Sequence, residues 1–469
     1  MTLLGGALAL GLVLWLGLGR SRSAPATNAT GGALPTLAPA QPVPQLPEPR
    51  VPEPPLPVLP TLPPAPLQGS APAPDPNALS PEDVNRANQL IERLKTRRRA
   101  EDSDLPIADE LAARYANEGG LADLREQVLL LLAGQRRGQR RFADAQALLQ
   151  RAIGHRPRSI PPRVMLSALL LETNDFTGAE AVAREGLQVD PRSHDLWFAL
   201  GYALFRQDKN REALEAAQAS LAIQENEQAR ALLVTLLKTK QDEGGMTEQQ
   251  LSHFHVRYDG ETHDDVGSEI LRALERHYAT LARALDHQPQ TAIPVILFSR
   301  EHYGEATGAP VWSGGVYDSL DGRIRIPIGG LTKSLTPSMD QTLIHELTHA
   351  FLADKTRGAI QQASPVNEGF AQYMEGHRAG TISGSRLAWV IEALPASHPS
   401  QCGHIGCVQG FYLGGLSLVE YLIGIHGLGG INDLFAAMGE TGSVDEAFRR
   451  VYGQDYAATR QAWRARLDR

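Results

Sequence analysis

The sequence predicts a multidomain chain in which an all-α solenoid is followed by an α+β domain. Helical patterns repeat with a period of 34 residues in the middle of the chain, and strand-like alternation appears only after residue 254. An apolar N-terminus and a proline-rich stretch precede both. The expected parts are residues 1–26 (signal peptide or membrane anchor), 27–78 (linker), 79–245 (helical repeats) and 252–469 (α+β domain).

Length and composition restrict the possible functions. The 469 residues have room for about three domains, and 42% of them are hydrophobic, as in ordinary folded cores. The net charge is −8, and no basic stretch is interleaved with aromatic residues. We therefore expect no nucleic-acid partner.

The first segment is an export signal or a membrane anchor. Residues Thr2 to Gly19 carry no charge, and eighteen such residues lie at the lower limit for crossing a bilayer. Arg20 and Arg22 follow the segment, which by the positive-inside rule would leave the rest of the chain in the cytoplasm. Ala24-Pro25-Ala26 offers a cleavage site instead. We expect an exported or membrane-anchored protein of the bacterial periplasm, with the anchor cleaved or retained.

A proline-rich segment follows. Between Pro35 and Pro76 lie 17 of the 32 prolines of the chain. Such a stretch favours extended polyproline II structure. It fits a semi-rigid spacer between the membrane and the folded domains better than a recognition site for a proline-binding module.

Residues in the middle of the chain recur every 34 positions. The segment Phe142-Ala-Asp-Ala returns as Phe176-Thr-Gly-Ala, and Pro157-Arg-Ser returns as Pro191-Arg-Ser. A third unit opens with Trp197, Leu200 and Gly201 and has Ala213 and Ala217 where its second helix should pack. Small residues at the helix crossing and a proline at the end of a unit resemble the tetratricopeptide repeat.

This resemblance implies three repeats from about Leu124 to Leu237, with helices between Pro81 and Asn117 as an N-terminal cap. The third unit has Glu225 where the proline would stand. Repeat arrays of this kind bind extended peptides or partner proteins on their concave face. A rigid docking platform for the following domain is the other interpretation.

The C-terminal part mixes strands and helices. Phe254–Tyr258 and Ile293–Phe298 are predicted strands, with a helix from Asp265 to Leu285 between them. A hairpin is expected from Gly315 to Pro327, and Pro327 suits an edge strand. The next helix should begin near residues 338–340, capped by Ser338 or Asp340.

That helix contains His345-Glu346-Leu347-Thr348-His349. Histidines at i and i+4 project from one face, where both imidazoles can bind one zinc ion. Apolar neighbours such as Leu343 and Phe351 predict a buried helix, and burying these polar residues without a metal would be costly. A metal-free polar face is the alternative.

A third ligand is available after a gap of eighteen residues beyond His349. Glu368 lies in Asn367-Glu368-Gly369 on an expected second helix, which completes the pattern H-E-x-x-H-x18-E. Three protein ligands leave one coordination position open, as catalytic zinc sites require.

These motifs resemble the thermolysin-like gluzincin peptidases, specifically the peptidase-MA-like group that is often joined to tetratricopeptide repeats. The resemblance covers about residues 252–469 and includes the Tyr412–Leu422 helix and the tail from Ala447 to Trp463. It implies a small strand-rich lobe, a helical lobe, and the zinc helix between them. It also implies that an edge strand near Val316 pairs with the substrate backbone.

The resemblance assigns roles to single residues. Zn²⁺ would be held by His345, His349 and Glu368, and Glu346 would be the general base for the attacking water. Tyr412 is the first candidate for the donor to the oxyanion, although it also fits a core aromatic position. The alternatives are Tyr373 and His404. Thermolysin has an acidic residue four positions after its third ligand, where this chain has Gln372.

Cys402 and Cys407 are the only cysteines. A short-range disulfide that closes a glycine-rich loop is favoured over a second metal site, for which only His404 offers a further ligand. A disulfide would agree with export.

Two functions follow. The first is a zinc metallopeptidase, with a peptide or protein substrate and a repeat module that binds substrates or partner proteins. The alternative is a catalytically inactive repeat scaffold with a metal-stabilised gluzincin-like domain. Glu346 counts for the enzyme, and Gln372 counts against it.

Overall fold

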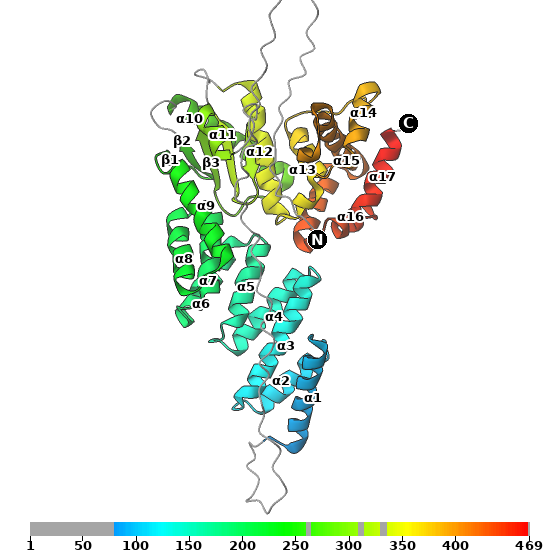
Figure 1. The fold of residues 1–469 in the computed structure, drawn as a ribbon. Coiled ribbons are helices and arrows are strands. Elements are labelled where there is room, and N and C mark those ends of the chain that lie inside the picture. The colour runs from blue at the N-terminus through cyan, green and yellow to red at the C-terminus, as the bar shows by residue number, and fades with distance from the viewer. Residues whose placement is uncertain (1–78, 259–263, 308–313, 329–334, 468–469) are drawn as a thin grey trace, which may run out of the picture.

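The computed structural model describes residues 79–258, 264–307, 314–328 and 335–467 (Figure 1). The expected N-terminal anchor and the proline-rich linker lie outside the described residues. Helices form the larger part of the described chain, and one small sheet lies beside them (Figure 1).

The N-terminal half is an array of antiparallel helices. The helices are α1 (Pro81–Arg97), α2 (Asp104–Arg114), α3 (Gly119–Gly138), α4 (Phe142–His155), α5 (Pro161–Glu172), α6 (Phe176–Val189), α7 (His194–Arg206), α8 (Asn210–Ile223) and α9 (Glu227–Glu243). Consecutive helices pack on each other, and the small residues predicted at the crossings are buried. A Cβ on Gly201 of α7 would lie 3.3 Å from the Ala213 carbonyl oxygen of α8. The array is therefore of the predicted tetratricopeptide type.

The 34-residue period also fixes the turns inside the helical pairs. Arg140, Asn174 and Asp208 occupy equivalent turns before α4, α6 and α8, and each has a positive φ, between 56° and 61°. Asparagine and aspartate tolerate this left-handed conformation better than most residues. The three turns lie at the edge of the array that faces the C-terminal half (Figure 1).

A five-stranded mixed sheet begins the C-terminal half. Its strands are β1 (Thr247–Gln250), β2 (Phe254–Tyr258), β3 (Ile293–Phe298), β4 (Val316–Asp318) and β5 (Arg323–Pro327), in the order β1-β2-β3-β5-β4. The strands β2 and β3 and the hairpin were predicted, whereas β1 was not. The prediction that the strand with Pro327 is the edge strand was wrong: β5 pairs with both β3 and β4, so β4 is the edge. Pro327 is tolerated because it is the last residue of β5.

Two long helices pack against the sheet. Helix α10 (Asp264–Leu285) connects β2 to β3, and α12 (Pro337–Lys355) lies beside β4 and β5; the short α11 (Arg300–Thr307) follows β3 (Figure 1). The sheet, α10 and α12 share one large apolar core. The N-cap of α12 is neither Ser338 nor Asp340. Thr336 caps it, because its hydroxyl accepts a hydrogen bond from the Met339 amide and Pro337 takes the first helical position.

The remaining chain is a helical lobe. It contains η1 (Ala359–Ala363), α13 (Ser364–Met374), α14 (Gly384–Ala393), η2 (Pro399–Gln401), α15 (Ile405–Thr441), α16 (Val444–Tyr452) and α17 (Tyr456–Leu467). Within the described residues α15 alone has the length and apolar composition of a membrane span, with a mean hydropathy of 1.3. Half of that stretch is buried, and Gly427 (φ 72°) breaks the helix in two. It is thus built like the core helix of a folded lobe.

Candidate metal centre

Helix α12 places three polar side chains in the interior. His345, Glu346 and His349 are 4%, 0% and 1% exposed. The two histidines lie on one face because they are four residues apart. The apolar residues around them, among them Leu347 and Phe351, belong to the main core. The buried helix predicted from the sequence is confirmed.

Helix α13 brings the third predicted ligand to the same point. Glu368 is 1% exposed, and the adjacent Gly369 lets α13 pack directly on α15. A Cβ on Gly369 would lie 2.2 Å from the carbonyl oxygen of Gly415. Only glycine fits there, so the Asn-Glu-Gly sequence fixes how deeply Glu368 enters the core.

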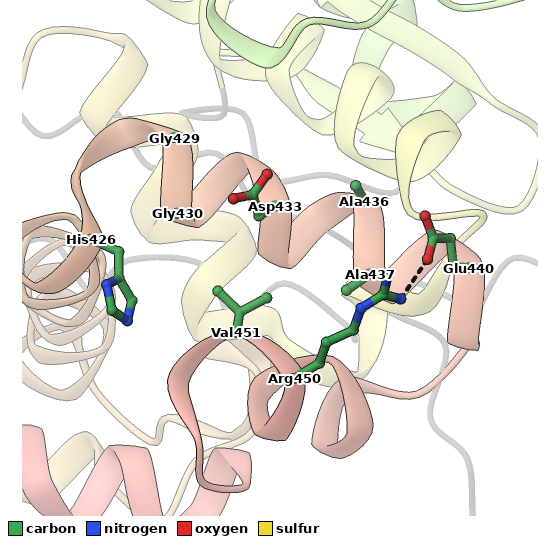
Figure 2. Close-up of a pocket in the computed structure, with 9 residues that line it drawn as sticks. All are labelled: His426, Gly429, Gly430, Asp433, Ala436, Ala437, Glu440, Arg450 and Val451. Carbon is green, nitrogen blue, oxygen red and sulfur yellow. Dashed lines mark hydrogen bonds and ion pairs between the residues drawn. The ribbon is translucent and has the colours of Figure 1, made fainter.

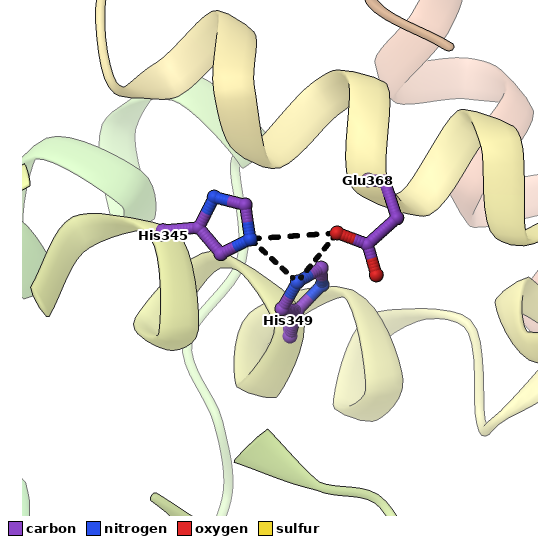
Figure 3. Close-up of side chains that lie close together, drawn as sticks. All are labelled: His345, His349 and Glu368. Atoms are coloured by element: carbon purple, nitrogen blue, oxygen red, sulfur yellow. Dashed lines mark hydrogen bonds and ion pairs between the residues drawn. The ribbon is translucent and has the colours of Figure 1, made fainter. Parts of the chain in front are cut away.

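The three predicted ligands form one cluster (Figure 3). The Nε2 atoms of His345 and His349 lie 3.1 Å apart, and each lies 3.4 Å from Oε2 of Glu368. All three ligand atoms lie within 4.8 Å of one another. Oε2 of Glu368 is buried and accepts no hydrogen bond. Two imidazole nitrogens and one carboxylate oxygen that converge in this way fit a zinc ion.

The outer nitrogens of both histidines have acceptors. Nδ1 of His345 donates to Oε1 of Glu375, and Nδ1 of His349 donates to Oδ1 of Asn367 at 3.0 Å. In a neutral ring these bonds place the proton on Nδ1, so that Nε2 is the atom available to bind a cation, as is usual in histidine metal sites.

Glu375 takes the place of the acidic residue that the resemblance led us to expect near His345. That residue was expected four positions after Glu368, where the chain has Gln372, and its absence counted against activity. Glu375, seven positions after Glu368, lies just beyond the end of α13, and its carboxylate reaches the His345 ring. The orienting charge is therefore present at a position that the family pattern did not indicate.

Glu346 is positioned by the edge strand. Its Oε2 accepts a hydrogen bond of 2.7 Å from the backbone amide of Tyr317 in β4, and its Oε1 is buried with no hydrogen-bond partner. Burial raises the pKa of Glu346, and the opposing charges of His345 and His349 only reduce this shift. A raised pKa suits a carboxylate that must accept a proton and release it again.

The cluster is strongly coupled electrically. Burial lowers the pKa of His345, but the Glu375 and Glu368 carboxylates outweigh it and hold that pKa well above its usual range. The pKa of His349 is also raised, because Glu368 outweighs burial. Burial raises the pKa of Glu368, yet the two imidazoles lower it far below the usual value. The carboxylates thus favour the charged form of both imidazoles, and the imidazoles favour the ionised form of Glu368.

The sequence offered three candidates for the donor opposite the metal. Tyr412 is buried on α15, the helix that packs on α13, and its ring lies edge-on to Phe411. Tyr373 stacks on Phe370 and lies under the Arg378 guanidinium. His404 is largely exposed and bonds Glu392 at 2.6 Å. The partner of His404, Glu392, is thus not one of the three predicted ligands.

His398 is a fourth candidate that sequence reasoning missed. It precedes η2, its Nε2 is buried without a hydrogen-bond partner, and its Nδ1 is 2.7 Å from the Ser400 hydroxyl. Burial lowers the pKa of His398, and the charge of Glu368 opposes that shift. No sequence motif surrounds it; its only signal is its place four residues before Cys402, the first cysteine of the disulfide loop.

The predicted disulfide is present. Cys402 and Cys407 are bonded, and Cys407 packs with Ala396 and Phe411. The bond ties the η2 segment, which follows His398, to the first turn of α15.

A separate cavity lies away from these residues. A cavity of about 660 Å³ opens between the second half of α15 and α16 (Figure 2). It is lined by His426, Gly429, Gly430, Asp433, Ala436, Ala437, Glu440, Arg450 and Val451. None of these residues belongs to the metal cluster, and Arg450 is already paired with Glu440. Its size alone gives it no role in the chemistry of the cluster.

Comparison with known families supports the repeats. Residues 136–200 match the model of the tetratricopeptide repeat, from the end of α3 into α7. No curated protein matches the chain. The repeat region is thus similar to a known protein-binding module.

Proposed function

We propose that the chain is a zinc-dependent peptidase whose repeat array binds a substrate or partner protein. The observation that carries the proposal is the buried convergence of His345, His349 and Glu368 beside the unpartnered carboxylate oxygen of Glu346. The repeat part has independent support, because tetratricopeptide arrays are protein-binding modules.

The donor set fits zinc. His345 and His349 would present Nε2, and Glu368 would present Oε2, with Glu375 and Asn367 holding the two rings. A zinc ion bound there would supply Lewis acidity toward water and toward a substrate carbonyl.

Glu346 has the properties of the proton carrier. One oxygen is held by the Tyr317 amide, so the other is oriented and free to accept a proton from an attacking water. Its raised pKa then allows the proton to pass to the departing amine. The edge strand β4, which holds Glu346, has one side unpaired within the described sheet and is suited to pair with an extended peptide.

A further donor would stabilise the oxyanion of the tetrahedral intermediate. Tyr412 remains the candidate from the sequence. His398 competes with it, because its Nε2 is buried and unpartnered and its pKa responds to the charge of Glu368.

The setting that we propose is the bacterial periplasm, with or without the N-terminal anchor. The disulfide between Cys402 and Cys407 supports an oxidising compartment. The substrate would then be an exported peptide or protein.

A catalytically inactive scaffold is the second candidate. The family match favours it, because that match covers repeat residues alone and repeats of this type bind proteins. In that case the metal cluster would only stabilise the C-terminal half.

One experiment distinguishes the two proposed functions. The purified chain, loaded with one equivalent of zinc, is incubated with a mixed peptide library, and the products are identified by mass spectrometry with and without a chelator. The enzyme predicts cleavage that the chelator abolishes. If the zinc-loaded chain binds partner proteins but leaves every peptide intact, the result supports the scaffold function.

A further inference from the structure

A buried ion-pair network joins the repeat array to the sheet. Asp208, in the turn between α7 and α8, is fully buried and accepts hydrogen bonds of 2.9 and 2.7 Å from the Arg257 guanidinium of β2. It also accepts a bond of 2.9 Å from Arg323, the first residue of β5. One carboxylate of the repeats thus serves two strands of the other domain.

Arg323 takes most of its partners from the repeat array, while its own hairpin adds Asp321 at 3.6 Å. Its side chain is 0% exposed, its Nη2 donates to Asn210 at 2.8 Å, and its guanidinium lies 4.8 Å from the centre of the Phe205 ring. All three of these residues, counting Asp208, come from α7, α8 or the turn between them. A buried arginine without its carboxylate is very unfavourable, so the hairpin is held where the array places Arg323.

The same hairpin holds the proposed general base. In the register of β4 and β5, Arg323 lies opposite Asp318, and Ile324 lies opposite Tyr317. The Tyr317 amide donates to Oε2 of Glu346. The hairpin is also closed by Asp321, which accepts the Arg323 amide at 3.0 Å and pairs with Arg325. Asp208 is therefore connected to Glu346 by one short hairpin.

The equivalent turns of the other two repeats contact the helical lobe. Arg140 donates to the carbonyl oxygen of Gly442 at the end of α15. Asn174 lies beside Gly358, just after α12, since a Cβ there would be 3.3 Å from its Nδ2. The turn edge of the array thus contacts both the sheet and the helical lobe.

We propose that Asp208 is a positioning residue for Glu346, and that the repeat array is a structural part of the metal centre. The array, through Asp208 and Arg323, fixes the hairpin whose Tyr317 amide orients Glu346. Its consequence for catalysis rests on the peptidase function proposed above, whereas the coupling itself does not.

The test compares two variants of the full chain. Asp208→Asn removes one of the two carboxylates that Arg257 and Arg323 share. The other, Glu243 of α9, lies 3.1 Å from Arg257 and 3.5 Å from Arg323 and is left in place. Glu180→Gln is the control. Glu180 pairs with Lys209 and Gln207 next to the same turn and with Arg184 of α6, all of which belong to the repeat array. Hydrogen exchange is followed in peptides that cover residues 314–328 and, for comparison, residues 270–281 of α10.

Asp208→Asn is expected to raise the exchange rate of the Tyr317 amide by about tenfold or more, with α10 unchanged, because the local opening of the hairpin becomes easier. It is expected to lower kcat and to leave KM and the zinc content unchanged. Glu180→Gln is expected to change none of these. Wild-type protection of Tyr317 in Asp208→Asn overturns the proposal.

Two safeguards keep the outcomes separable. If Asp208→Asn does not fold, Arg323→Lys keeps the charge but loses the fork of donors, and the same rise in exchange is expected; unchanged exchange again overturns the proposal. If no variant and no wild-type sample cleaves peptides, the peptidase function fails, but the exchange of Tyr317 still decides whether the array positions the hairpin.

Discussion

Zinc should stabilise the C-terminal half through three named atoms. The two Nε2 atoms and Oε2 of Glu368 face one another, and that Oε2 is buried without a hydrogen-bond partner. A ligand that binds only the folded state adds RT ln(1 + [L]/Kd), which is about 2.7 kcal/mol at a free concentration of 100 Kd.

This free energy converts to a measurable shift. The domain from residue 252 to the end has roughly 220 residues, so its unfolding entropy is about 0.46 kcal/mol/K and the melting temperature should rise by about 6 °C. Differential scanning fluorimetry, at fixed protein concentration with zinc or with a chelator, measures this shift.

Three substitutions refine the measurement. His349→Ala and Glu368→Gln each remove a ligand and should abolish most of the zinc-dependent shift. Glu346→Gln should retain it, because Glu346 is held by the Tyr317 amide and not by the ligand cluster. Equal melting temperatures of the wild type with zinc and with chelator would refute the metal centre. Loss of the shift in Glu346→Gln alone would refute the assignment of roles.

The remaining predictions concern protons, the outer ligand, the disulfide and the ion-pair network. The pKa of His345 is well above its usual range, and a histidine ligand must be neutral, so zinc binding at pH 7 should release about one proton or more and its affinity should rise with pH. Titration calorimetry in two buffers of different ionisation enthalpy measures this proton release. Identical apparent enthalpies in the two buffers would contradict it. Glu375→Gln should weaken zinc binding by about 10- to 100-fold, whereas Gln372→Ala should not. Replacing both Cys402 and Cys407 by serine should lower the free energy of unfolding by about 2 kcal/mol, since the disulfide closes a short loop. Urea unfolding measures this loss, and an unchanged free energy would mean that the bond does not stabilise the fold. Burial raises the pKa of Asp208, but His255, Arg257 and Arg323 outweigh it and hold the pKa far below its usual range. Its stabilisation is complete above the unfolded value near 3.9, declines as pH falls below that value, and is lost only as pH falls through the much lower folded pKa. The stability difference between wild type and Asp208→Asn should therefore begin to shrink below about pH 4 and keep shrinking as the acid concentration rises; a constant difference would contradict the pairing.

Local patterns in the sequence were sufficient for much of the fold. The 34-residue period predicts the helical array because each unit packs only on its neighbours, and α3 to α8 follow it. Strands β2 and β3 are short runs of buried residues, which alternation and length reveal. The strand β1 was missed because all four of its residues are exposed, so no apolar pattern marks it.

Part of the metal cluster could be predicted from the sequence for the same reason. Helical spacing fixes His345 and His349, and the Asn-Glu-Gly sequence marks Glu368. Glu375 and His398 could not be found, because their positions depend on how the chain turns after α13 and before α15. The Asp208 network joins residues 49 to 115 positions apart, and such pairs leave no periodic signal.

The most direct test of the central claim is the comparison of wild type with Glu346→Gln, both loaded with one zinc per chain. On any peptide that the wild type cleaves, kcat/KM of Glu346→Gln should fall by about 100-fold or more, since general base catalysis contributes that much, while zinc content and melting temperature stay the same. Equal cleavage by the two zinc-loaded proteins would contradict the claim that Glu346 serves a catalytic metal centre.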